Sequence, residues 1–205
     1  MYSLYNKKTQ EYENELIVVC SRKGAKSYDS IADLQKDWAD VSPEEEQGGG
    51  FDWAAAKDNL IKTDCGITLC RQDYSERYKK YFTFDEALEI EKEAKKHGFR
   101  LPTVQDFEKL YAYYGVDKDG NDTPQRFVDE LGFSYSGYWD SASSSASDLG
   151  SYGYYWSSSV FDTGGGYLLY FNSSNVYPQY SNYKYYRLTL KFIYDPEGAK
   201  DEVKE

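Results

Sequence analysis

His97-Gly98-Phe99-Arg100-Leu101-Pro102-Thr103 predicts the end of one helix and the start of the next. Thr83 and Glu86 form a capping box for the upstream helix, and Gly98 is typical of the residue that ends one. Thr103 is typical of an N-cap. Apolar side chains recur at helical spacing beyond it: Val104, Phe107, Leu110, Tyr111 and Tyr114. The sequence therefore predicts two amphipathic helices joined by this short turn.

Further helices are predicted on both sides of this pair. Thr123 and Pro124 are typical of the N-cap and first residue of a third helix, which ends at Gly132. Ser30 can cap a short helix that reaches Trp38, and another helix is predicted from Trp53 to Ile61.

The N-terminal part, residues 1–82, is expected to elaborate a single domain of residues 1–195. Its apolar run at 15–21 is rich in β-branched residues and predicts a buried strand. Residues 44–50 combine like charges with three glycines, which indicates a mobile connector.

The composition changes after Gly132, where Tyr, Ser, Gly, Asn and Asp dominate up to Tyr186. Binding loops of antibodies use the same residues, because Tyr offers a large and stiff contact area while small polar residues adapt around it. Strands are expected at 154–160, 167–171 and 186–193, and the last of these alternates apolar and polar residues like a half-buried strand. Residues 196–205 form a charged tail.

Length and charge restrict the class of protein. The chain has 205 residues and a formal net charge of −11, without a basic stripe, so we expect no nucleic-acid partner. It contains no apolar run long enough to span a membrane and shows no export signal, which favours a virion-associated or cytoplasmic location.

Its three cysteines favour buried thiols over a disulfide or zinc framework.

Catalytic and metal-binding alternatives are weaker than structural ones. His97 is the only histidine, and it sits where a helix C-terminus favours positive charge. The acidic stretch 117–122 could offer oxygen ligands to calcium, but Val128 replaces the glutamate expected at the twelfth loop position, so a turn is favoured. Gly164-Gly165-Gly166 lacks a following Lys-Ser or Lys-Thr and predicts a hairpin loop. We expect no catalytic residue, metal or cofactor.

Three segments carry a resemblance to a known family: the turn at 97–103 with its helix, Tyr155-Trp156-Ser157-Ser158-Ser159, and the strand from Arg187 to Phe192. Together they resemble C-type-lectin-fold proteins, typified by the Fibrobacter succinogenes major paralogous domain and the variable proteins of diversity-generating retroelements. The family's terminal Val-Arg pair is Leu190-Lys191 here, and the calcium-lectin motifs are absent.

The resemblance implies an α+β, C-type-lectin-like fold with small antiparallel sheets, flanking helices and paired N- and C-terminal strands. It also implies that 133–191 is a variable binding region, in which mutagenesis of template adenines scatters Tyr, Ser, Asp and Gly over exposed positions. The function implied is recognition of a protein or glycan on a cell surface, as in a viral or phage receptor-binding component. Formylglycine-generating enzymes share the fold, but their activity needs a reactive cysteine pair near the C-terminal active site.

The tyrosines after Gly132 are interpreted as a binding surface, because those beyond Asn172 follow no apolar period. Tyr111, Tyr114, Trp156 and Phe171 are instead expected in the core. The alternatives are a packed aromatic sheet whose exposed tyrosines bind nothing, and a surface or glycan-binding module that is not diversified. The expected ligand-binding residues are Tyr152, Tyr154, Phe161, Asp162, Asn175, Tyr177, Tyr180, Ser181, Asn182, Tyr183 and Tyr186.

Overall fold

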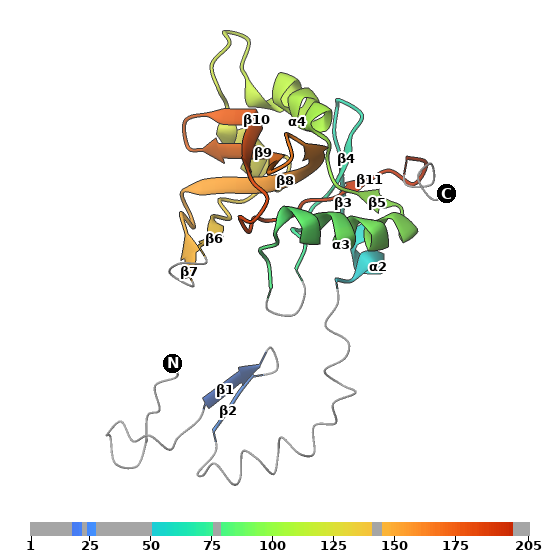
Figure 1. The fold of residues 1–205 in the computed structure, drawn as a ribbon, viewed down its shortest axis with the longest axis vertical. Coiled ribbons are helices and arrows are strands. Elements are labelled where there is room, and N and C mark those ends of the chain that lie inside the picture. Colours follow the sequence, from blue (N-terminus) through green and yellow to red (C-terminus); the bar gives the residue numbers. More distant parts are fainter. Residues whose placement is uncertain (1–17, 22–23, 28–50, 76–78, 141–144, 199–205) are drawn as a thin grey trace. The chain divides into compact units, whose positions relative to one another are not determined.

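The computed structural model describes residues 18–21, 24–27, 51–75, 79–140 and 145–198 (Figure 1). The chain divides into two compact units between Gly49 and Gly50. The predicted helix at 30–38, the predicted connector at 44–50 and tail residues 199–205 lie outside the described residues.

The first unit contains an antiparallel pair, β1 (Val18–Ser21) and β2 (Gly24–Ser27). The second unit contains, in chain order, α2 (Trp53–Lys57), β3 (Leu60–Lys62), β4 (Thr68–Cys70), α3 (Phe84–Lys96), β5 (Phe99–Arg100), α4 (Val104–Leu110), the π-helical turn η1 (Tyr111–Gly115), α5 (Pro124–Asp129), β6 (Tyr138–Asp140), β7 (Ser145–Ser147), β8 (Tyr152–Val160), β9 (Gly165–Asn172), β10 (Val176–Tyr183) and β11 (Ile193–Tyr194). The mixed α+β class and the small antiparallel sheets are confirmed.

The strands of the second unit form three sheets, with the orders β3-β4-β11-β5, β10-β9-β8 and β6-β7. The implied pairing of the N- and C-terminal strands is not found for β1, the first strand that the structure describes. Val18–Ser21 pairs with Gly24–Ser27, a partner so near along the chain that closing the loop costs little entropy. Ile193 in β11 is flanked on both sides, by Leu69 of β4 and Arg100 of β5.

The predicted helix starts are largely confirmed. Both bonds of the Thr83–Glu86 capping box form, and Gly98 has a φ of +82° where α3 gives way to β5. Pro124 is the first residue of α5, but Thr123 is not its side-chain cap, because its hydroxyl donates to the carbonyl of Tyr114 at 2.7 Å. The helix predicted from Trp53 to Ile61 is shorter, since it ends at Lys57 and the chain then enters β3.

The segment predicted as a half-buried strand at 186–193 is instead a buried connector. Only its end belongs to β11, and Leu188 and Thr189 form isolated bridges to Phe82 and Tyr155. Residues 188–193 are all buried, polar ones included, because the segment runs between two groups of core side chains. Its alternating sequence therefore does not indicate an exposed face.

The sheet β10-β9-β8 separates two hydrophobic cores. One face carries Tyr155, Leu169 and Phe171 into a core shared with α4 and α5. The other face carries Trp156 and Leu168 into a second core that includes Phe84, the first residue of α3. The expected burial of Trp156 and Phe171 is confirmed.

The side chain of Lys191 is completely buried and holds three segments together. Its ammonium group donates to the carbonyl of Arg71 at 2.7 Å, to the Asp73 carboxylate at 3.0 Å and to the carbonyl of Gly132. The Asp73 carboxylate also accepts the hydroxyl of Tyr155, at 2.9 Å. Burial lowers the pKa of Lys191, and the negative charge of Asp73 opposes that shift. Residues 188–193 are thus held to the chain after β4 and to the chain after α5, and, through Asp73 and Tyr155, to β8.

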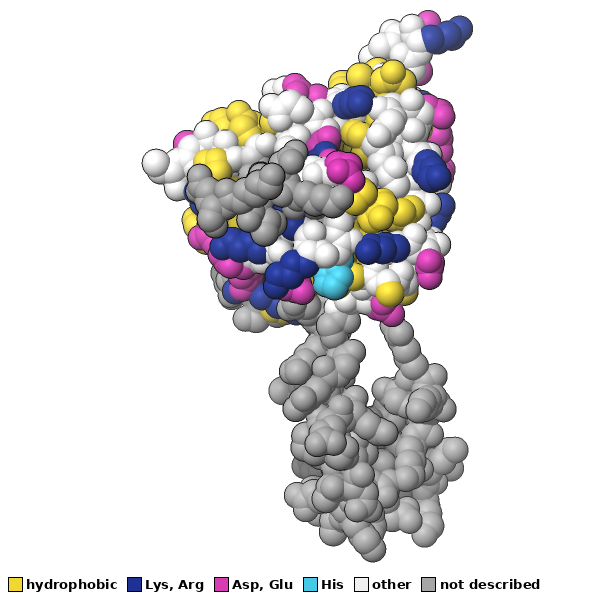
Figure 2. Space-filling model, turned by 90° about the vertical axis from the view of Figure 1, so that its right-hand side faces the viewer, with side chains coloured by type: hydrophobic (Ala, Val, Ile, Leu, Met, Phe, Trp, Pro, Cys, Tyr) yellow, Lys and Arg dark blue, Asp and Glu magenta, His cyan; other side chains and the backbone are white. Residues whose placement is uncertain are grey.

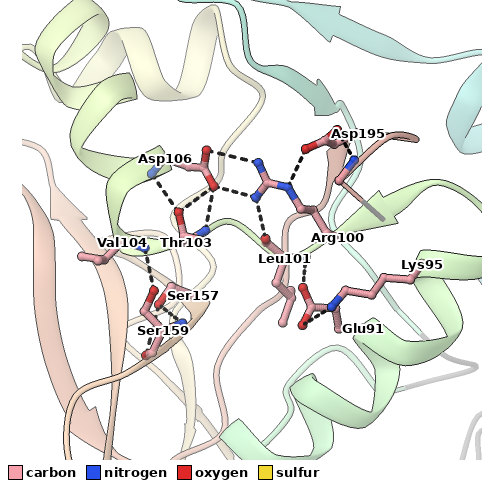
Figure 3. A network of polar contacts seen from close by, with 11 residues as sticks. Glu91, Lys95, Arg100, Leu101, Thr103, Val104, Asp106, Ser157, Ser159 and Asp195 are labelled. Atoms are coloured by element: carbon pink, nitrogen blue, oxygen red, sulfur yellow. Dashed lines mark hydrogen bonds and ion pairs between the residues drawn. The ribbon is translucent and has the colours of Figure 1, made fainter. Parts of the chain in front are cut away.

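Arg100 is the centre of a second polar network, in the turn between α3 and α4 (Figure 3). Its guanidinium group donates to Asp106 at 2.6 Å, to Asp195 at 2.9 Å and to the carbonyl of Leu101 at 3.1 Å. The Leu101 amide donates to the buried Glu91 of α3 at 2.9 Å. The turn is therefore tied to both helices and to the chain that follows β11.

The serines after Trp156 dock β8 onto this turn, as Figure 3 shows in part. The amide of Ser158 donates to the carbonyl of Pro102 at 2.8 Å, and the Val104 amide donates to the Ser159 hydroxyl at 3.0 Å. The Ser157 hydroxyl accepts from the amide of Ser159 at 3.0 Å, where the pairing of β8 with β9 is irregular. Two motifs that are distant in the sequence are thus in direct contact.

We expect Lys191→Met to destabilise the second unit by about 3–5 kcal/mol, because it leaves Asp73 and two backbone carbonyls without their cation. Urea unfolding of the full chain followed by tryptophan fluorescence measures the loss. Lys92→Met is the matched control, since that side chain is 70% exposed. A loss below about 1 kcal/mol would show that water can replace the ammonium group.

Acid should weaken the Arg100 network. Burial opposes ionisation of Asp106, but the hydrogen bonds and charge of Arg100 outweigh it and hold the pKa of Asp106 below its usual value. The hydrogen bond from Arg100 also lowers the pKa of Asp195. Since both pKa values are lower in the folded chain, this stabilisation is complete above the unfolded-state value, about pH 4, and is lost as the pH falls through the folded-state values.

The unfolding midpoint in urea, measured from about pH 6 to pH 2, should therefore fall less steeply in Asp106→Asn than in the original chain. The exposed Asp119 lies outside the network, and Asp119→Asn is the control. Parallel curves for all three proteins would rule out this source of acid sensitivity.

Candidate binding surface

Tyrosines from three strands stack on one face of the sheet β10-β9-β8. Tyr154, Tyr170 and Tyr177 lie directly opposite one another in the strand register. Tyr152 stacks on Tyr170 with ring centroids 5.8 Å apart and planes 13° apart, and Tyr177 stacks on Tyr170 at 5.4 Å and 24°. Tyr170 is the central ring of this cross-strand stack.

A β-bulge adds another tyrosine to the same face. Tyr177 pairs with Tyr170 and Tyr180 pairs with Leu168, so three steps along β10 match two along β9. Without the extra residue, side chains three positions apart would point to opposite faces. The bulge instead brings the Tyr180 ring to 5.0 Å from that of Tyr170.

A second stack follows β10. The ring of Tyr185 lies 5.5 Å from Tyr183 and 5.0 Å from Tyr186, with planes 8° and 23° apart. Tyr138 of β6 contacts Tyr186 at 5.9 Å and Tyr154 at 5.5 Å, and so joins the two stacks. We call the connected set the tyrosine surface: Tyr138, Tyr152, Tyr154, Tyr170, Tyr177, Tyr180, Tyr183, Tyr185 and Tyr186.

The outer members of this set face solvent. Tyr177 is 44% exposed, Tyr180 46%, Tyr183 61% and Tyr185 67%. The expected exposure of Tyr177, Tyr180 and Tyr183 is confirmed. Other members, including Tyr154, Tyr170 and Tyr186, are half-buried and pack against the second core.

Asp148 fixes the orientation of Tyr154. Its carboxylate accepts the Tyr154 hydroxyl at 3.0 Å, and its carbonyl accepts the amides of Ser151 and Tyr152 in the turn before β8. Asp148 has a φ of +59°, a conformation that Asp adopts more readily than most residues. Burial raises the pKa of Tyr154, and the Asp148 carboxylate adds to the shift, so this phenol stays protonated.

The other predicted site residues lie outside this ring network. Phe161 and Asp162 are in the hairpin loop after β8, where Phe161 packs edge-on against Tyr167 at 5.2 Å and the Asp162 carboxylate accepts the Gly164 amide at 2.8 Å. The predicted hairpin is present, but its loop is not at 164–166, because Gly165 and Gly166 already belong to β9 and only Gly164 lies in the loop. Asn175 is exposed in the turn between β9 and β10, and its amide bonds to Asn172. Ser181 and Asn182 continue β10 and pair with Tyr167 and Gly166.

Sequence reasoning missed three members of the tyrosine surface: Tyr138, Tyr170 and Tyr185. Tyr170 lies between Leu169 and Phe171, which concealed it within an apolar run. The alternation of side chains along a strand could have identified it, because Tyr170 points to the sheet face opposite to that of its two neighbours. Tyr138 belongs to the set only through tertiary contacts, with Tyr154 and Tyr186, whereas Tyr185 joins it by stacking on its sequence neighbours Tyr183 and Tyr186.

The titratable groups considered in the sequence have structural contacts. His97 caps the end of α3, bonds to Glu93 at 3.3 Å and stacks on Trp53. Asp117 accepts the amides of Asp119 and Asn121, so the predicted turn is confirmed. Burial raises the pKa of the Cys70 thiol, which makes it a poor nucleophile.

Charges and possible metal ligands are dispersed. On the face shown in Figure 2, the coloured Lys and Arg side chains lie among acidic and apolar ones instead of forming a stripe. Within the described ranges, no three His, Cys, Asp or Glu side chains come close enough to hold a metal ion. The helices of those ranges include none with the length and apolar character of a membrane span.

Comparison with models of protein families, with curated proteins and with solved structures gives no match to this chain. The resemblance to C-type-lectin-fold variable proteins therefore rests on the sequence motifs.

Proposed function

We propose that this chain is a non-enzymatic binding protein that recognises a macromolecular ligand through its tyrosine surface. The observation that carries the proposal is the connected set of nine tyrosines, four of them more than 40% exposed, on and beside a sheet with a packed core on each face. Large exposed aromatic patches of this kind mark interaction sites in soluble proteins.

The energetics of the surface suit binding. Tyrosine has few rotatable bonds, and mutual stacking restricts the rings further, so little side-chain entropy is lost when a ligand binds. Tyr residues are also among the most frequent hot spots in interfaces. Because the sheet is held by Lys191 and by the serines of β8, the rings are displayed on a stiff support.

The distribution of contacts supports a diversified surface. Tyr177, Tyr180 and Tyr183 are exposed on β10 and are not members of either core cluster, whereas Tyr154 and Tyr170 pack against the second core. Substitution at the β10 positions should change the ligand without affecting the fold. This pattern favours a variable receptor-recognition protein, such as a viral or phage component, over a fixed module.

The test is a binding screen against a glycan array and a displayed library of peptides and small folded domains. We expect the original chain to select a ligand, and the triple variant Tyr177→Ser, Tyr180→Ser, Tyr183→Ser to bind it at least tenfold more weakly, because three aromatic anchors are lost. Tyr113→Ser is the matched control, since Tyr113 is 54% exposed and lies outside the tyrosine surface.

Circular dichroism and urea unfolding must first show that the triple variant is folded. Equal affinity of the folded variant and the original chain, or no ligand in either arm, would refute the proposed function.

A further inference from the structure

β10 carries exposed rings of the tyrosine surface but has a neighbouring strand on one side only. It lies at the edge of its sheet, and among the described strands only β9 pairs with it. The pairing is interrupted between Tyr177 and Tyr180, where the register shifts. Such a shift leaves backbone groups of the ladder unpaired. Contacts other than the ladder are therefore needed to hold these two rings in place.

The start of β10 is bound by a carboxylate from the turn before α5. Asp122 Oδ2 accepts the amide of Val176 at 3.0 Å, across 54 residues of sequence. The side-chain nitrogen of Asn175 lies 3.5 Å from the same oxygen. Val176 is the first residue of β10 and directly precedes Tyr177, so this hydrogen bond fixes the chain one residue before the first exposed ring.

Asp122 is itself held firmly. Its Oδ1 accepts the hydroxyl of Tyr111 in η1 at 2.8 Å, and this hydrogen bond raises the pKa of Tyr111, so the phenol remains a donor at neutral pH. The backbone of Asp122 forms an antiparallel bridge with Val116. The next amide, that of Thr123, donates to the carbonyl of Gly115 at 2.7 Å. The carboxylate is thus a fixed acceptor, anchored to η1.

A second carboxylate binds β10 inside the shifted stretch. The side-chain amide of Gln179 donates to Glu108 of α4, the helix beside β10 (Figure 1). Gln179 lies between Tyr177 and Tyr180 in the sequence. Asp122 and Glu108 therefore hold β10 before and within the stretch where the register shifts, and both lie outside the tyrosine-rich residues 133–191.

We propose that Asp122 is a positioning residue of the tyrosine surface, which holds the start of β10 so that the Tyr177 ring stacks on Tyr170. Its contribution to binding rests on the proposed function, whereas the placement of the ring does not. A ring that is already in place loses less entropy when a ligand binds. Asp122 acts through Val176, and Glu108 supports the same strand.

NMR of the full chain tests the proposal without a ligand, because cross-relaxation between ring protons reports the distance between two rings. In Asp122→Ala we expect the cross-peak between Tyr170 and Tyr177 to fall by about half or more, and exchange of the Val176 amide to accelerate about tenfold or more, because a hydrogen bond to a charged group is lost. Asp119→Ala is the matched control, since Asp119 is exposed in the same turn.

The stack of Tyr152 on Tyr170 is an internal reference, because it joins β8 to β9 without β10. Its cross-peak should be unchanged in every variant. A merely structural role of Asp122 would lower the urea midpoint and leave both cross-peaks unchanged, and this result would overturn the inference. Loss of both cross-peaks together would also overturn it, since Asp122 would then support the whole sheet.

If Asp122→Ala does not fold, Asp122→Asn takes its place, because it keeps the size of the side chain while its single amide oxygen replaces two acceptors. Failure of both variants to fold would overturn the inference, since Asp122 would then be required by the unit as a whole. The outcome is independent of the binding screen. A negative NMR result leaves the proposed function standing, and unchanged binding by the triple Ser variant removes that function but not the positioning of Tyr177.

Discussion

A buried ammonium group constrains the whole second unit. Lys191 has no access to water, so its charge is tolerated only while Asp73 and two backbone carbonyls remain in place. These oxygens come from the chain after β4 and from the chain after α5. If either segment moved away, the ammonium group would remain buried without a partner, which is energetically costly. The neighbouring residues of the same segment bridge to Phe82 and Tyr155, which places β8 relative to both cores.

The position of β8 in turn decides where tyrosines can face water. Toward its C-terminal end, Trp156 is covered by Phe84 at the start of α3, and the serines dock on the turn at Pro102. At the start of β8 the same face carries Tyr152 and Tyr154, which lie beside the central ring, Tyr170. One sheet face therefore changes from core to surface along its length, and stacking between tyrosines continues the packing outward.

Features set by local chemistry could be predicted from the sequence, and features set by distant contacts could not. The capping box at Thr83 and the stop at Gly98 depend on residues within one helical turn, so both were recognisable. The course of the segment 186–193 depends on what lies on its two sides, and its alternating pattern was misleading. Tyr180 reaches the tyrosine surface only because of a bulge; Pro178, within the shifted stretch, is typical of edge strands and bulges, but it does not say which rings the shift brings together. The exposure of the late tyrosines was predictable from their polar neighbours, but their stacking was not.

The arrangement separates the half-buried rings of the tyrosine surface from its exposed rings. Tyr170 and Tyr154 are half-buried and pack against the second core, and Asp148 accepts the hydroxyl of Tyr154. Tyr177 and Tyr180 of β10 contact the ring of Tyr170 but belong to neither core cluster. Different side chains could therefore occupy these two positions while Tyr154 and Tyr170 stay unchanged. The spacing of the rings along β10 is set by strand register and by the bulge.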